Sequence, residues 1–128
     1  MALLLVSVAL LMGTTCNKTR TCEGAICTML FASVTVQVVD SLNVPVQLDD
    51  VYTVRNSTGE QIRLSQPMTG GRYNILDDGF QKKIENTSES FELIGTKGGQ
   101  QIIKEPYYIS ADCCHIKKDS GKDSIIVR

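Results

Sequence analysis

Apolar and polar residues alternate with a period of two along several short segments of the chain. The clearest segment is residues 33–40, where valines recur at every second position and separate one apolar face from one polar face. Further β-prone segments, with turn residues between them, are 46–55, 61–64, 72–76, 91–94, 101–104, 107–116 and 124–127. This pattern predicts short strands that each bury one face.

Helical periodicity is nearly absent after the first residues of the chain. Residues 80–88 are the only weak helix candidate, and they are poor in apolar side chains. Turn residues at 97–99 and at 119–122 predict two hairpins. The sequence therefore predicts an all-β fold, an antiparallel β-sandwich of Ig-like type with about seven strands, after an N-terminal signal peptide.

The N-terminal residues differ from the rest of the chain. Residues 2–12 are apolar apart from one serine, a run too short to cross a bilayer, whose apolar core takes about 20 residues, but suited to a signal peptide. The segment Met12-Gly13-Thr14-Thr15-Cys16 resembles the lipobox of bacterial lipoproteins, which implies that Cys16 is acylated. We expect a lipoprotein signal peptide at 1–15, a tether at 16–27 and a domain at 28–128. Secretion without acylation, or a buried terminal element, are the alternatives.

The other four cysteines are Cys22, Cys27, Cys113 and Cys114. An even number in an exported chain favours disulfides. If residues 107–116 form one strand, side chains alternate along it, so that Cys113 points into the core and Cys114 outward. We therefore expect Cys27–Cys113 inside and Cys22–Cys114 outside. On the chain-entropy model, the ring closed by the inner bond contributes roughly 4.5 kcal/mol to stability.

A metal site or a reactive thiol is the alternative use of these cysteines. Cys113 and His115, the only histidine, would share a strand face and could bind zinc together with Cys22 and Cys27. The spacing argues against it, because adjacent strand residues diverge. A reactive thiol usually lies at a helix N-terminus or beside a cation, and no such helix is evident. Disulfides are the favoured interpretation.

Composition and motifs exclude several functions. The net charge of −1 and the pI of about 5.8 give no basic field for nucleic acid, and no tryptophan is present for stacking. No motif of a hydrolase, a metalloprotease or a phosphate-binding loop occurs, so we expect no enzyme activity and no cofactor. The adjacent acids Asp49-Asp50 and Asp77-Asp78 are interpreted as solvated turn residues, with a weak calcium site at Asp77-Asp78-Gly79 as the alternative.

A resemblance to a known family rests on four short motifs between residues 34 and 76. They are Val36–Asp40, Pro45-Val46, Thr58-Gly59-Glu60 and Gly71-Arg72-Tyr73-Asn74-Ile75. This stretch resembles the carboxypeptidase regulatory-like domain, which implies a non-enzymatic, transthyretin-like sandwich. The whole chain is similar to small lipoproteins of Bacteroidetes type. That similarity implies a lipid-anchored protein of the cell envelope, in the outer membrane, on its periplasmic or its surface face.

The function expected from the sequence is that of a structural or ligand-binding module. The membrane would be contacted through the lipid anchor, and a protein or glycan ligand through loops of the sandwich. The candidate loops are the segments Gln66–Gly71 and Asp77–Ser90. The alternative function is metal binding or thiol redox chemistry at the Cys-Cys-His cluster.

Overall fold

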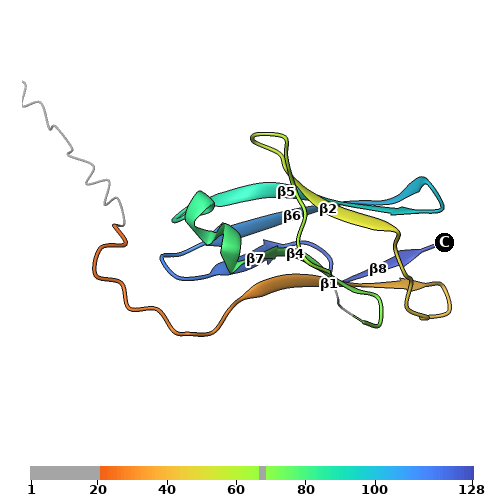
Figure 1. Cartoon of the computed structure of the whole chain (residues 1–128), viewed down its shortest axis with the longest axis horizontal. Coiled ribbons are helices and arrows are strands. Elements are labelled where there is room, and N and C mark those ends of the chain that lie inside the picture. Colours follow the sequence, from red (N-terminus) through yellow and green to blue (C-terminus); the bar gives the residue numbers. More distant parts are fainter. Residues whose placement is uncertain (1–20, 67–68) are drawn as a thin grey trace, which may run out of the picture.

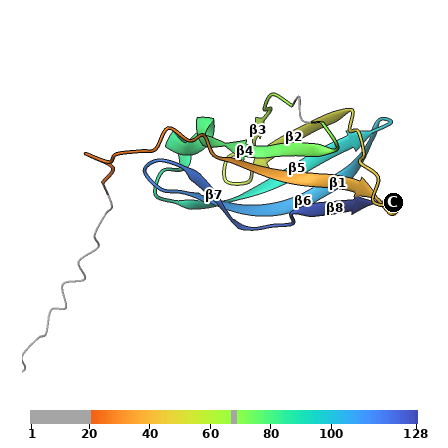
Figure 2. The same cartoon turned by 90° about the horizontal axis from the view of Figure 1, so that it is seen from below.

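The structure is a computed structural model, and it describes residues 21–66 and 69–128. The proposed signal peptide and Cys16 lie outside the described residues. Two β-sheets pack face to face, as Figures 1 and 2 show from two directions. The predicted all-β sandwich is therefore confirmed.

Eight strands and one short helix make up the described part of the chain. In chain order they are β1 (Ser33–Asp40), β2 (Asp50–Arg55), β3 (Glu60–Ile62), β4 (Arg72–Asp77), the 3₁₀ helix η1 (Asp78–Ile84), β5 (Ser88–Lys97), β6 (Gln100–Ala111), β7 (Ile116–Ser120) and β8 (Ser124–Val127). One sheet has the order β4-β1-β8 and the other β3-β2-β5-β6-β7. All neighbouring strands are antiparallel except β1 and β8, which run parallel.

The core lies between the two sheets and is made by their alternating inward positions. The valines of β1 are buried as the period of two predicts, at positions 34, 36 and 38. The largest fully buried side chains of the sandwich include Tyr107, Phe91, Ile75, Leu76, Ile84 and Leu93. Removing such apolar surface from water is the main force that holds the sheets together. Two buried hydroxyls make polar links in the core. The Thr53 hydroxyl on β2 donates to Ile75 O on β4 at 2.6 Å and so joins the two sheets, and the Tyr73 hydroxyl accepts from Leu48 N at 2.8 Å and donates to Val46 O at 2.9 Å.

Strand β6 corrects the sequence-based prediction of two strands at 101–104 and 107–116. It is one strand of 12 residues that passes through Pro106 and ends at Ala111. Proline lacks an N–H and is tolerated in a sheet where one side of the strand has no partner. Pairing of β6 with β7 involves only Tyr108 to Ala111, so β6 has a single neighbour, β5, at Pro106. The proline therefore marks a local edge and not the end of a strand.

The expected hairpin around 119–122 does not form, because β7 and β8 belong to different sheets. The chain crosses between the sheets at Gly121, whose φ of +129° suits glycine. A Cβ atom there would overlap the ring of Tyr107, which fills the space beneath the crossover. The predicted hairpin at 97–99 is confirmed as the β5–β6 turn. The weak helix candidate at 80–88 is found as η1, shifted to Asp78–Ile84.

Candidate functional site

The strand registers divide the sandwich into two ends. We call one the stapled end: it holds the N-terminal arm (residues 22–32), η1 and the β6–β7 turn (112–115). We call the other the loop end: it holds the β1–β2 connection (41–49), residues 69–71 and the β5–β6 turn. The start of β5 pairs with the end of β6, and Figure 1 shows β1 beginning at this same end of the sandwich. In Figure 1 the arm, in orange, lies at the end opposite the C-terminus.

All four cysteines of the described residues form disulfides, but not in the predicted pairs. Cys22 is bonded to Cys113 and Cys27 to Cys114, with Cα–Cα distances of 5.2 and 5.3 Å. The prediction of Cys27–Cys113 and Cys22–Cys114 was wrong because it assumed a strand through residue 114. The strand ends at Ala111, so alternation between faces does not apply to the two cysteines.

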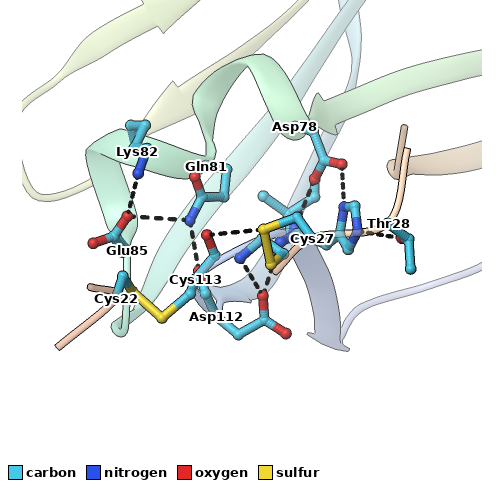
Figure 3. The surroundings of a disulfide bond; sticks show 12 residues. Cys22, Cys27, Thr28, Asp78, Gln81, Lys82, Glu85, Asp112 and Cys113 are labelled. Atoms are coloured by element: carbon cyan, nitrogen blue, oxygen red, sulfur yellow. Dashed lines mark hydrogen bonds and ion pairs between the residues drawn. A yellow bond between two sulfur atoms is a disulfide. The ribbon is translucent and has the colours of Figure 1, made fainter. Parts of the chain in front are cut away.

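The turn that carries Cys113 and Cys114 is built by Asp112. Its Oδ1 accepts hydrogen bonds from Cys114 N at 2.7 Å and from His115 N at 2.8 Å. Aspartate commonly closes turns in this way, by accepting from backbone N–H groups a few residues ahead. The bond from His115 N–H, followed by that from Cys114 N–H, lowers the pKa of the Asp112 carboxyl. Both sulfur atoms are thereby presented toward the arm, as Figure 3 shows for Cys22–Cys113.

A chain of three polar side chains lies beside the disulfides. The Asp78 Oδ2 atom is 2.6 Å from His115 Nδ1, and His115 Nε2 is 3.0 Å from Thr28 Oγ1. Asp78 also accepts from Ala32 N at 2.7 Å and from Ile116 N at 2.8 Å. The prediction that Asp78 is a solvated turn acid was wrong, because its side chain is only 9% exposed.

The ionised form of Asp78 is stabilised by these partners. Burial by itself would raise the pKa of this carboxyl, but the hydrogen bonds from Ala32 N–H, from His115 and from Ile116 N–H together hold its pKa below the usual range. Each bond connects a different segment: the arm, the turn and strand β7. Asp78 is therefore a further point, beside the two disulfides, at which the arm is fixed to the sandwich.

The order carboxylate, imidazole, hydroxyl also occurs in acyl-transfer triads, so the surroundings of His115 decide what it can do. Such a site needs backbone N–H groups aimed at a developing oxyanion. The four N–H groups bonded to acids here, at residues 32, 114, 115 and 116, all donate to Asp78 or Asp112. The arrangement therefore positions the arm and offers none of these groups to a substrate.

The described part of the structure does not have the geometry that a metal site would need. The proposed ligands of such a site were Cys113, His115, Cys22 and Cys27. The four sulfur atoms are joined in pairs, and His115 contacts Asp78 and Thr28. Within residues 21–66 and 69–128, no group of three or more His, Cys, Asp or Glu side chains is arranged to hold a metal ion. An open hollow of about 610 Å³ beside the turn is lined partly by Ser110, Asp112, His115 and Lys117.

The loop end presents apolar side chains on an ordered turn. Leu42 is 81% exposed and Val44 52% exposed. Asp40 Oδ1 accepts from the backbone N–H of both residues at 2.9 Å, and Asn43 between them has a φ of +63°. This conformation is tolerated by asparagine better than by most residues. No sequence-based prediction singled out Leu42 and Val44, although the Asp-Ser-Leu-Asn-Val turn between two strands is visible in the sequence.

The two loops predicted to bind a ligand lie at different places. Segment Asp77–Ser90 contains η1 and belongs to the stapled end. Segment Gln66–Gly71 leads into β4, and Gly71 O accepts from Val38 N at 2.7 Å, near the end of β1. Pro67 and Met68 lie outside the described residues. Only the second segment therefore reaches the loop end.

Comparisons of the chain with protein-family models, with curated proteins and with solved structures found no match. In the described residues there is no helix with the length and apolar character needed to cross a bilayer.

Proposed function

We propose that this protein is a non-enzymatic lipoprotein of the cell envelope, anchored through Cys16 and acting as a structural or ligand-binding sandwich. The observation that carries the proposal is the difference between the two ends of the molecule. The chain enters at the stapled end, where two disulfides fix it, whereas the exposed Leu42 and Val44 lie at the loop end. An anchor at one end leaves the other free to meet a protein or glycan ligand.

The anchor is supported by the segment Met12–Cys16 and by the disulfides. Disulfides persist in oxidising compartments outside the cytoplasm, in agreement with export. A diacylglyceride on Cys16 with an added N-acyl chain would give stable anchoring, because one chain alone binds membranes only marginally. The resemblance to small Bacteroidetes-type lipoproteins with a carboxypeptidase regulatory-like domain supports the outer membrane, on its periplasmic or surface face.

The binding role is supported by how the loops are held. Ligand sites are often formed by loops that a rigid scaffold positions. At the loop end, Gly98 N donates to Asp49 Oδ2 at 2.6 Å, which ties the β5–β6 turn to the β1–β2 connection. The alternative of metal or thiol chemistry requires free thiolates, and the paired sulfur atoms do not favour it.

Intact mass of the full chain, expressed in a diderm bacterium, tests the proposal. We expect a mature protein that begins at Cys16, carries acyl chains and has no cysteine that reacts with an alkylating agent before reduction. The matched variant Cys16→Ala should lose the acyl mass and leave the membrane fraction. Cleavage elsewhere without acylation would contradict the anchor, and two or more reactive cysteines would favour the thiol alternative.

A further inference from the structure

The N-terminal arm exposes a group of apolar side chains that the sandwich does not cover. Ile26 is 98% exposed, Met29 103%, Leu30 78% and Phe31 67%. From residue 24 to residue 32 the arm contains no charged side chain. Single exposed apolar residues are common on protein surfaces, but contiguous apolar patches mark interaction sites. We call residues 26–31 the apolar arm.

The exposure of the apolar arm is imposed by the bonds that hold its backbone. Cys27, within it, is bonded to Cys114, and the Thr28 hydroxyl lies 3.0 Å from His115 Nε2. Just after it, Ala32 N donates to the buried Asp78 at 2.7 Å. These contacts fix the arm from both sides of Met29 and Leu30. The apolar side chains are consequently held at the surface of the stapled end.

The length of chain before the arm decides what lies next to it. Cys22, the first disulfide residue, follows Cys16 by six residues. A chain spans at most about 3.6 Å per residue, so six residues reach at most about 22 Å. If Cys16 is acylated, the stapled end is held within that distance of the bilayer. Lys18 and Arg20 lie between the anchor and the arm, where they suit anionic headgroups.

We propose that the apolar arm inserts into the interface of the bilayer that holds Cys16. The inference rests on the proposed lipid anchor and adds a second contact to it. The bilayer is within reach of every anchored molecule, and its interface accepts Leu, Met and Phe side chains. Two contacts on one end orient the sandwich, so that the loop end points away from the membrane. The disulfides then keep the apolar side chains of the arm facing lipid.

A tryptophan reporter tests the inference, because the chain has no tryptophan of its own. Phe31→Trp places the reporter in the apolar arm of the full lipidated protein. Tyr108→Trp is the matched control, since Tyr108 is a 52% exposed aromatic residue on β6. Both variants are reconstituted into vesicles of phosphatidylethanolamine and phosphatidylglycerol, with and without brominated acyl chains. We expect a blue-shifted emission and loss of most of the fluorescence to brominated lipid for Phe31→Trp alone.

Other outcomes overturn the inference in distinguishable ways. If both variants float with the vesicles but neither is quenched, the anchor stands and the arm does not contact lipid. If Phe31→Trp is blue-shifted without quenching, and the shift grows with the protein-to-lipid ratio, a second copy covers the arm instead. If the protein has no acyl mass and does not float, both the anchor and the inference fail. Adding Met29→Ser and Leu30→Ser to Phe31→Trp should reverse the blue shift while the protein still floats.

Discussion

The N-terminal arm at the stapled end and the Asp40 turn at the loop end are ordered by different kinds of interaction. At the stapled end the partners are distant in the sequence, with separations of 91 and 87 residues for the disulfides and 46 for the bond from Ala32 to Asp78. At the loop end, the Asp40 carboxylate closes its turn on residues only two and four positions away. The arm is therefore fixed by partners that the fold brings together, whereas the Asp40 turn is fixed by its own sequence.

The largest expected effect concerns the disulfides. Replacing all four bonded cysteines with serine should lower the free energy of unfolding by about 5 kcal/mol, because the bonds close a very long ring. Replacing only Cys27 and Cys114 should cost well under half as much, since Cys22–Cys113 still closes a ring over 91 positions and keeps most of the constraint on the unfolded chain. Urea unfolding measures both. Strictly additive losses for the two bonds would contradict the view that they form one staple.

A smaller loss is expected from Gly71→Ala at the loop end. A Cβ atom at Gly71 would lie 2.5 Å from Val38 O, and the residue has a φ of +73°. Strain and overlap together should cost about 3 kcal/mol. The matched variant is Gly70→Ala, with a φ of +72° and no atom within 4 Å, which should cost only about 1 kcal/mol. Equal losses in urea unfolding would show that residues 69–71 do not pack against β1.

The variant Asp78→Asn tests the polar link at the stapled end. It removes the charge that three donors stabilise, and a loss of about 2 kcal/mol is expected. Asp123→Asn is the control, because that side chain is 92% exposed and its pair with Lys118 lies at the surface, where such pairs contribute at most about 1 kcal/mol. Limited proteolysis within the arm should accelerate for Asp78→Asn only. An unchanged cleavage rate would mean that the disulfides alone hold the arm.

Acid should weaken the stapled end through its carboxylates. The pKa of the Asp78 carboxyl is lowered although burial opposes this. Backbone N–H groups lower the pKa of Asp112, and the hydrogen bond from Arg55 lowers the pKa of Glu89. A carboxyl whose pKa is lower in the folded state than its unfolded value of about 4 stabilises the folded state at pH values above about 4. This contribution to stability is lost as the pH falls through the pKa of the folded state. The free energy of unfolding, measured from pH 7 to pH 2, should decrease once the pH drops below about 4. The decrease should be less steep for Asp78→Asn.

The smallest effect on stability is expected where binding is proposed. The double variant Leu42→Ser and Val44→Ser removes exposed side chains and should change the free energy of unfolding by less than about 0.5 kcal/mol. A photo-crosslinking residue at Leu42 should nevertheless capture a cell-envelope component in living cells, whereas one at Tyr108 should not. Equal capture at both positions would remove the loop end as the binding surface.

Local patterns were sufficient for much of the fold. Strand β1 has the predicted bounds, 33–40, because its alternating valines bury one face whatever their partner is. The β5–β6 turn follows from Gly98 and Gly99, whose φ values of +59° and +74° most other residues avoid. The participation of four cysteines in disulfides was also predicted correctly, because an even count in a chain expected to be exported favours disulfides.

The tertiary structure decided the pairing of those cysteines, the crossover to β8 and the role of Asp78. Each depends on segments that meet only after folding: β6 ends where Asp112 closes a turn, β8 lies beside β1, and a carboxylate in a turn motif is buried by the arm and β7. A sequence pattern reports which face of a segment is apolar. It does not report which distant segment covers that face, because a long-range contact depends on the packing of both partners.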